Sequence, residues 1–306
     1  MYDVVIIGGG PSGLTAAIYA SRAGLNALII EKAGCGGQMA ITDALENYPG
    51  FSSVNGFELA SKLEEQARNF GAAIIYEEVV EISDGAVKKV KTVGAQYETK
   101  TIIIASGTNA KKLGAAGEEN FIGRGVSFCA VCDAPFYKNK TVAVVGGGDS
   151  AIQEAIYLSK FASSVFVLHR RDKLRAAKSL QNKMLSHQNI SVIYDVAPEE
   201  ICGKEKIEKF IISNVKTGEK TDLKVDGIFV FIGLTPNSAF LQYVALDENG
   251  YIIADENMKT NIAGIFACGD VRKKHLRQVV TAASDGAQAA VSALDYIEKQ
   301  GDSLVK

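Results

Sequence analysis

The sequence predicts an α/β protein with two parallel sheets, each begun by a strand, a glycine-rich turn and a helix. Such a unit occupies residues 4–31, and the same order of elements recurs over residues 141–168. The chain has 306 residues, which suits two domains of about 150 residues each. Apolar residues make up 47% and charged residues 22% of the chain, which is the balance of a globular protein.

The first unit begins with the apolar run Val4–Ile7, which is typical of a strand buried on both faces of a parallel sheet. The turn GGGPSG follows at residues 8–13, and the Ala-rich composition predicts a helix over residues 14–23. A second strand is expected at residues 27–30, and it ends on Glu31. This is the G-x-G-x-x-G pattern in the strand-to-helix context of a dinucleotide-binding turn.

Each glycine of this pattern has a physical role. Gly8 permits the tight turn, Gly10 leaves room for a pyrophosphate, and Gly13 lets the helix pack closely on the strand. The helix N-terminus offers unpaired N–H groups to phosphate oxygens, and Glu31 can accept hydrogen bonds from an adenosine ribose. The alternative is a tight turn that binds no ligand. The contacts expected from this unit are Gly8, Gly10, Pro11, Ser12, Gly13 and Glu31.

The second unit repeats the pattern but ends differently. A strand is expected at residues 141–145, the turn GGGDSA at 146–151, a helix at 151–161 and a strand at 165–168. That last strand runs into the basic segment HRRDKLR instead of ending on an acid. The contacts expected from this unit are Gly147, Gly148, Asp149, Ser150, Arg170, Arg171 and Arg175.

The three arginines favour NADP over NAD. A guanidinium group matches the 2′-phosphate of NADP, whereas an acid suits the free 2′-hydroxyl of NAD. A solvated basic loop is the alternative, but this loop falls where the ribose is expected. We therefore expect FAD at the first unit and NADPH at the second. Two cofactors that exchange a hydride indicate a flavoprotein oxidoreductase.

A pair of closely spaced cysteines lies just before the second unit, in the segment CAVCD. Cys129 and Cys132 can close a short disulfide, and the adjacent Asp133 could exchange a proton with a thiol. A zinc half-site and two buried structural thiols are the alternatives. Scattered histidines and an odd cysteine count argue against a zinc site and a structural disulfide framework. The five cysteines are Cys35, Cys129, Cys132, Cys202 and Cys268.

The bulk charge gives no support for a nucleic-acid or membrane partner. Lys and Arg total 33 and Asp and Glu total 35, so the net charge is −2. No apolar run reaches the about 18 residues that a membrane span needs. A strand-like run starts almost at the first residue, without a basic leader before it. We therefore expect a cytoplasmic protein.

Over nearly its full length the sequence resembles a family of flavoenzymes. The motifs that carry the resemblance are, in chain order, GGGPSG, GCGGQ, ENYPG, IIIASGT, CAVCD, GGGDSA, HRRDKLR, GIFACGDV and RQVVTAASDGAQAA. In order and spacing they are similar to the low-molecular-weight, bacterial-type thioredoxin reductases of the pyridine nucleotide-disulfide oxidoreductase family. The succession of CAVCD, GGGDSA and HRRD is the most specific part of this resemblance.

The resemblance implies two Rossmann-like, three-layer domains, with an NADPH domain inserted into an FAD domain. The FAD domain would comprise residues 1–112 and 239–306, and residues 113–238 would form the NADPH domain with the redox CxxC. The sequence supports the split independently. Only about 70 residues follow the strand-like run at 227–232, which is too few for a third nucleotide-binding domain.

The resemblance also assigns roles to single residues. Cys132 would face the flavin, Cys129 would attack the thioredoxin disulfide, and Asp133 would be the acid/base. Electrons would pass from NADPH through FAD and the dithiol to thioredoxin, in a homodimer whose NADPH domain rotates about linkers near Leu113 and Asn237. Further FAD contacts carried over are Gly37, Gln38, Asn47, Gly107, Gly269, Asp270, Arg277, Gln278 and Val279.

Two features depart from the family pattern. Ala134-Pro135 stands where the family usually has Gly, and we expect a stiffer turn after the dithiol because Pro fixes φ and Ala resists positive φ. Cys35 is interpreted first as a small residue in a loop beside the flavin, and second as a regulatory thiol. The alternative functions are a same-fold reductase for a peroxiredoxin-type or thioredoxin-like acceptor, and a flavin-bound redox sensor without turnover.

Overall fold

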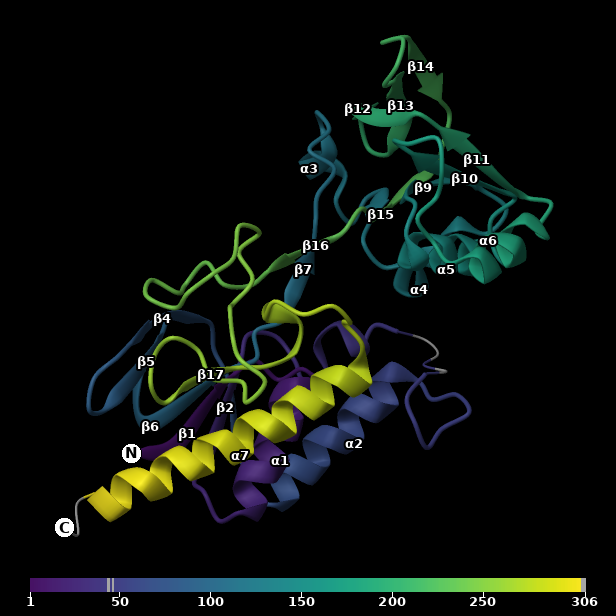
Figure 1. Cartoon of the computed structure of the whole chain (residues 1–306). Helices are drawn as coiled ribbons and strands as arrows, with labels where there is room; N and C mark the ends of the chain where they lie inside the picture. Colours follow the sequence, from purple (N-terminus) through teal and green to yellow (C-terminus); the bar gives the residue numbers. More distant parts are fainter. Residues whose placement is uncertain (43–44, 46, 304–306) are drawn as a thin grey trace. The chain divides into compact units, whose positions relative to one another are not determined.

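The structure is a computed structural model of the whole chain. It describes residues 1–42, 45 and 47–303, without the side chains of 131, 132 and 301–303. The chain forms two compact units, drawn in Figure 1. Unit 1 comprises Met1–Asn109 and Thr235–Lys306, and unit 2 comprises Ala110–Leu234.

Unit 1 is built on a mixed sheet with the strand order β3-β2-β1-β6-β5-β4, and β17 pairs with β6. Five strands of this sheet run parallel to one another: β3, β2, β1, β6 and β17. Parallel neighbours cannot be joined by a tight hairpin and need longer connections. The hairpin β4–β5 adds two antiparallel strands at the edge. The bounds are β1 Tyr2–Ile7, β2 Ala27–Glu31, β3 Ala73–Tyr76, β4 Val79–Ser83, β5 Lys88–Thr92, β6 Gln96–Ile104 and β17 Ile265–Ala267.

Helices cover one face of this sheet. The long helix α7 packs along α1 (Figure 1), and α1 also packs against α2. Val4 and Ile6 of β1 point toward this helical face. Val5 and Ile7 point to the opposite face, where they pack against the segment that contains Leu241 and Ile252. This alternation is why β1 reads as one continuous apolar run. The helical elements are α1 Pro11–Arg22, η1 Gly37–Met39, α2 Gly56–Asn69, η3 Gly269–Val271 and α7 Val279–Ser303.

Small residues bring α1 and α7 into close contact. A Cβ atom built on Gly286 of α7 would lie 2.1 Å from the carbonyl oxygen of Ser12, so only glycine fits there. Buried alanines line the rest of this interface on both helices, and they keep the two backbones close. The C-terminal helix is thereby fixed over the first turn of α1.

Unit 2 is built on an all-parallel sheet with the order β11-β10-β9-β15-β8. The helices α5 and α6 cover one face, and a three-stranded antiparallel sheet, β12-β13-β14, covers the other. The strands are β8 Val126–Ser127, β9 Thr141–Gly146, β10 Ser164–His169, β11 Ile190–Tyr194, β12 Val196–Gly203, β13 Ile207–Asn214, β14 Lys220–Leu223 and β15 Gly227–Phe231. The helical elements are α3 Glu118–Phe121, α4 Ala130–Asp133, η2 Ala134–Tyr137, α5 Asp149–Leu158 and α6 Lys178–Leu185.

The chain passes between the units in two short strands, β7 (Thr108–Ala110) and β16 (Leu234–Pro236), which pair with each other. Asn237, near which a linker was expected, is bound inside unit 1. Its backbone N–H donates to the Gly107 carbonyl at 3.0 Å, and its side-chain amide donates to the Ser106 carbonyl at 2.9 Å. Leu113 is bound inside unit 2, where its N–H donates to Glu118 Oε1 at 2.8 Å. The passages therefore lie a few residues before both expected positions.

The segment after the dithiol forms a short helical turn. Ala134 begins the 3₁₀ helix η2 and is fully buried, and it is not among the described non-glycine residues that have positive φ. Pro135 sits in the first turn of η2, where no intrahelical partner for an N–H is needed. Ala134 therefore needs no positive φ at this position, and the stiffer turn after the dithiol stays a prediction.

Among the described residues, no helix combines the length and the apolar character that a membrane crossing requires.

The contact between α1 and α7 gives a stability prediction. Ala is a better helix former than Gly by about 0.5–1 kcal/mol, so Gly286→Ala would stabilise an unhindered helix. Here the added Cβ collides with the backbone of α1, and we expect a net loss of about 1–3 kcal/mol in the free energy of unfolding. Chemical denaturation measures it, with Ser284→Ala, at an exposed position of the same helix, as the control. A gain in stability for Gly286→Ala would contradict the close contact.

Candidate active site

In the glycine-rich turn of unit 1, backbone atoms of the protein occupy the space beside two glycines, and the space beside a third glycine holds no protein atom. A Cβ on Gly8 would lie 2.4 Å from the Ala105 carbonyl oxygen, and one on Gly13 would lie 1.9 Å from the Gly8 carbonyl oxygen. A Cβ on Gly10 would meet no protein atom within 4 Å. Gly10 is the residue before α1 and has no side chain to cap the helix. This open space at a helix N-terminus fits a phosphate group.

Glu31 is fixed at the end of β2. Its carboxylate accepts a hydrogen bond from the Gly9 N–H at 2.6 Å and another from the Ala33 N–H at 3.0 Å. The acid therefore lies directly beside the glycine turn, with its orientation set by two backbone donors. This is the place where a ribose bound by the turn would need acceptors.

Cys35 packs beside the same turn. Its Sγ would be 3.0 Å from a Cβ on Gly9, so Cys35 fills the space next to this glycine. Burial, together with the negative charges of Glu64 and Glu31, raises the pKa of the Cys35 thiol to about 12. The thiol stays protonated at neutral pH, which favours the interpretation as a space-filling residue over that as a reactive regulatory thiol.

Gly269 and Asp270 form a turn that lies against the start of α1. Gly269 has a φ of +75°, and a Cβ there would lie 2.4 Å from Ser12 Oγ. The Asp270 Oδ1 atom is buried without a hydrogen-bond partner among the described residues. Burial raises the pKa of this carboxyl, and the charges of Lys274 and Arg277 oppose the rise. A buried acceptor with no donor in the protein fits a ligand hydroxyl.

Hydrogen bonds and close contacts connect several of the other expected residues of unit 1 to their neighbours. Gly37 lies beside Gly10, since a Cβ on Gly37 would be 3.5 Å from Gly10 Cα. The Gln38 amide donates to the Thr108 carbonyl at 3.0 Å, next to Gly107 with its φ of +64°. The remaining four are Asn47, Arg277, Gln278 and Val279. The side-chain amide of Asn47 donates to Gln278 Oε1 at 2.9 Å, and Val279 is the first residue of α7.

The turn of unit 2 repeats this geometry. A Cβ on Gly146 would lie 2.4 Å from the Phe231 carbonyl oxygen, whereas one on Gly148 would meet nothing within 4 Å. Asp149 begins α5, and its Oδ1 accepts from the Ala177 N–H at 2.7 Å. Ser150 follows in the first turn of α5 and is exposed. The open space again lies at a helix N-terminus.

His169 takes the place that Glu31 has in unit 1. It ends β10, and a Cβ on Gly147 would lie 2.2 Å from its Nδ1 atom. The Nε2 atom is buried without a partner among the described residues. Burial lowers the pKa of the imidazole, and the charges of Arg175, Arg171 and Arg170 contribute to the lowering. The ring is therefore neutral at pH 7, and it does not add to the positive charge of the neighbouring arginines.

The three arginines at this strand end are free to bind an anion. Arg170, Arg171 and Arg175 are all exposed, and no ion pair joins them to an acid among the residues that the structure describes. The segment is anchored by its backbone instead, because the Arg175 N–H donates to the Gly147 carbonyl at 2.7 Å. The basic loop is therefore held against the glycine turn.

The cysteine pair lies in unit 2, at the short helix α4. Cys129 takes part in a disulfide bond and is half-buried, and its N–H donates to Ser127 Oγ at 3.1 Å. Cys35, Cys202 and Cys268 are free thiols. Cys132 belongs to α4, and its side chain lies outside the described part of the chain. Asp133 ends α4, where its N–H donates to the Cys129 carbonyl at 3.3 Å.

Asp133 borders an open pocket of about 190 Å³. Phe136 and Tyr137 line the pocket on one side and Arg124 on another, and Phe136 is 72% exposed. Burial raises the pKa of the Tyr137 hydroxyl, and the charge of Asp133 adds to the rise. The acid beside the cysteine pair is thus accessible from solvent.

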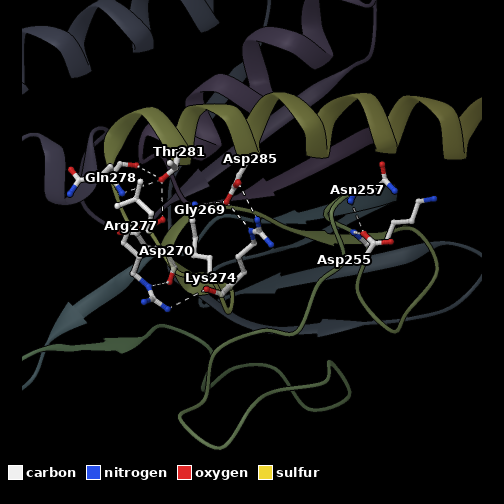
Figure 2. Close-up of polar contacts among 12 residues, drawn as sticks. Asp255, Asn257, Gly269, Asp270, Lys274, Arg277, Gln278, Thr281 and Asp285 are labelled. Atoms are coloured by element: carbon white, nitrogen blue, oxygen red, sulfur yellow. Dashed lines mark hydrogen bonds and ion pairs between the residues drawn. The ribbon is translucent and has the colours of Figure 1, made fainter. Parts of the chain in front are cut away.

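Sequence analysis missed the polar network below the Gly269–Asp270 turn. Figure 2 shows Asp285 of α7 pointing toward Gly269 and Lys274. The carboxylate of Asp285 accepts from the Gly269 N–H at 3.1 Å and from Lys274 Nζ at 2.7 Å. No motif marks Asp285, and only the three-dimensional contact identifies it. The role of His169 had a sequence signal: it follows Gly146 by 23 residues (169 − 146), as Glu31 follows Gly8 (31 − 8).

Comparisons with known proteins agree with this arrangement. The family described as pyridine nucleotide-disulphide oxidoreductase matches residues 2–286. A thioredoxin reductase of Listeria innocua is 47% identical, over 99% of this chain and 96% of its own. One of Bacillus subtilis is 45% identical, over 99% and 97%. A crystal structure of Lactococcus lactis thioredoxin reductase superposes with a TM-score of 0.94 at 47% identity, over 98% of this chain and 100% of that one. The chain therefore belongs to the pyridine nucleotide-disulphide oxidoreductase family, among its thioredoxin reductases.

Proposed function

We propose that the chain is an NADPH-dependent thioredoxin-disulfide reductase that carries FAD in unit 1 and binds NADPH in unit 2. The observation that carries the proposal is a disulfide-bonded Cys129 next to the accessible acid Asp133, in the same unit as a dinucleotide turn with unpaired arginines. A redox-active disulfide needs an electron source, and a chain with two dinucleotide turns can hold one.

Unit 1 is proposed to hold the FAD. The open space at Gly10 would receive the pyrophosphate, and the carboxylate of Glu31 would bind the adenosine ribose. The unpartnered Asp270 Oδ1 would accept a hydrogen bond from a hydroxyl of the ribityl chain. Gln38 and Asn47 are proposed as further FAD contacts. Gln278 and the start of α7 would lie near the isoalloxazine ring, as the family resemblance implies.

Unit 2 is proposed to hold the NADPH. Gly148 leaves space for the pyrophosphate at the start of α5, and the exposed arginines would bind the 2′-phosphate with charge-assisted hydrogen bonds. A neutral His169 in place of an acid supports this preference, because a carboxylate there would repel the phosphate. NADH lacks that phosphate and would gain nothing from the arginines.

A bound flavin would accept hydride from the nicotinamide and deliver electrons to a disulfide. The residues of this chain would then carry out thiol–disulfide exchange. The thiolate of Cys129 attacks one sulfur of the acceptor disulfide, and the other acceptor sulfur leaves as a thiol that takes its proton from Asp133. The thiolate of Cys132 next attacks Cys129 in the mixed disulfide. This step releases the reduced acceptor and restores the intramolecular disulfide.

Thioredoxin is the proposed acceptor, because thioredoxin reductases are the relatives that match the whole chain. The exposed Phe136 and the cationic Arg124 flank the pocket at Asp133, and they would offer apolar and charged contacts to a docking protein. A peroxiredoxin-type or thioredoxin-like protein is the alternative acceptor. A homodimer, which the resemblance implies, and a cytoplasmic location, which the sequence composition suggested, stay predictions.

Steady-state turnover tests the proposed function. Purified, FAD-loaded protein should oxidise NADPH rapidly in the presence of thioredoxin from the same source, and Cys129→Ser should abolish this turnover while the flavin is still reduced by NADPH. Cys202→Ser, at a free thiol elsewhere in unit 2, is the control and should retain full activity. If Cys129→Ser turns over like the wild type, the dithiol is not on the electron path. If NADPH reduces the flavin but thioredoxin stays oxidised, the acceptor is another disulfide protein.

The arginine loop predicts cofactor selectivity. Replacing Arg170 and Arg171 with Ala should raise KM for NADPH at least about tenfold, since even one hydrogen bond to a charged group is worth about 1.5–3 kcal/mol. KM for NADH should change little. Lys183→Ala, on the neighbouring helix α6, controls for the general loss of positive charge. An equal rise for both nucleotides would show that the 2′-phosphate is not bound here.

The two open glycines predict separable binding defects. Gly10→Ala and Gly148→Ala place a methyl group where no protein atom lies within 4 Å and where φ is negative, so neither should lower the melting temperature. Gly10→Ala should weaken FAD retention and leave NADPH binding to unit 2 unchanged, and Gly148→Ala should do the reverse. Each variant is the control for the other. If both variants bind both nucleotides with wild-type affinity, the two turns are not part of the binding sites.

A further inference from the structure

Asp285 is a buried acid that no motif of the sequence explains. It projects from α7 toward the Gly269–Asp270 turn (Figure 2), and its side chain is only 9% exposed. The carboxylate accepts four hydrogen bonds: one from the Gly269 N–H, two from the Arg272 guanidinium at 2.9 and 3.3 Å, and one from Lys274 Nζ. A single carboxylate thus holds two cations and one backbone donor.

Both cations are themselves buried. The side chain of Lys274 is 7% exposed and that of Arg272 is 15% exposed. A buried charge is costly unless an opposite charge compensates it, so these two side chains depend on a nearby acid. Asp285 is the acid that they contact.

The third basic side chain of the turn has other partners. The Arg277 guanidinium stacks over the Tyr251 ring at 4.1 Å. It also lies 3.4 Å from the Asp270 carbonyl oxygen and 3.5 Å from that of Arg272, and it donates to both. Arg272, Lys274 and Arg277 therefore form their hydrogen bonds with groups other than the side chain of Asp270.

The carboxyl group of Asp270 is left with a buried oxygen that no donor of the described protein satisfies. This is notable because Lys274, which forms an ion pair with Asp285, also carries a charge that lowers the pKa of Asp270. The turn holds three cations and two acids, so one positive charge is in excess. An ammonium group released from Asp285 would find Asp270 as its nearest alternative.

We propose that Asp285 is a positioning residue for FAD: by holding Arg272 and Lys274, it keeps the Asp270 carboxylate open to a hydroxyl of the bound cofactor. This rests on the proposed function, in which unit 1 binds FAD. Without the charge of Asp285, the freed cation binds Asp270 and occupies the acceptor that the cofactor needs. Asp285 therefore acts on the cofactor through two other side chains and does not touch it.

Asp285→Asn tests this directly, because it keeps the size and an acceptor for the Gly269 N–H but removes the charge. The measurement is the rate of FAD release from the purified full-length holoenzyme, followed by the rise of flavin fluorescence after dilution. We expect release at least tenfold faster than in the wild type, with a changed visible flavin spectrum. Asp295→Asn, an exposed position of the same helix, is the matched control and should release FAD at the wild-type rate.

The double variant Asp285→Asn/Lys274→Met separates positioning from a structural role. It removes the cation that Asp285→Asn leaves uncompensated and returns the turn to one excess positive charge. We expect release at least threefold slower than in Asp285→Asn. If Asp285 only supports the fold, the double variant releases FAD as fast as the single one or faster, and the proposal fails. It also fails if Asp285→Asn releases FAD at the wild-type rate.

A third variant covers the case in which Asp285→Asn does not fold. Lys274→Met alone leaves Asp285 paired with Arg272, and we expect FAD release within about threefold of the wild type, since the proposal gives Lys274 no contact with the cofactor. A tenfold faster release would show that Lys274 itself holds FAD and would overturn the proposal. A wild-type protein that purifies without flavin would instead refute the proposed function, whatever the variants do.

Discussion

The contact of two glycines with Ser12 is the constraint on which the rest of unit 1 depends. Gly269 and Gly286 come from the C-terminal part of the chain, and each approaches Ser12 so closely that a Cβ would collide with it. Ser12 lies in the first turn of α1, beside the open space at Gly10. The contact therefore brings the acidic turn and the start of α7 to the site that the N-terminal glycines form. A binding site with contributions from both ends of the chain needs such a close junction, because looser packing would let its two halves shift.

The two dinucleotide turns show how one backbone geometry serves two different ligands. Both leave open space at the residue before a helix, and both place a side chain from the neighbouring strand end against the central glycine. In unit 1 this side chain is a carboxylate held by backbone N–H groups, and in unit 2 it is a neutral imidazole followed by arginines. In the proposed function, the backbone would provide for a pyrophosphate in both units, and one strand-end residue with its neighbours would set the charge that the ribose meets.

The local parts of this structure could be predicted from the sequence. The strands, glycine turns and helices of both units lie within a residue or a few of the expected ranges, because apolar periodicity and glycine spacing act over short distances. The alternation of Val4 to Ile7 between two faces follows from the same pattern. The resemblance was confirmed as the family, whereas the residues that it assigns to FAD stay predictions.

The long-range parts could not be predicted in this way. Asp285 binds residues that precede it by 11 to 16 positions, and on a helix it resembles any surface acid until the fold buries it. The passages between the units were expected near Leu113 and Asn237, but hydrogen bonds to Glu118 and Gly107 assign these residues to units 2 and 1. The conformation of Ala134 was not predicted, and the 3₁₀ helix η2 gives it one that needs no positive φ. Each case is decided by partners that a short window of sequence does not contain.

The discontinuity of unit 1 has a consequence for how the chain is made. The ribosome completes unit 2 at Leu234, whereas β17 and α7 of unit 1 follow only after residue 264. Until then the buried alanines of α1 lack the helix that covers them, so the first 109 residues expose apolar surface. The inserted unit 2 can already fold during this time. Unit 1 closes last, when Gly286 reaches Ser12. The chain is thus most exposed to aggregation between the synthesis of its first 109 residues and that of α7, and in this interval a chaperone would protect it most.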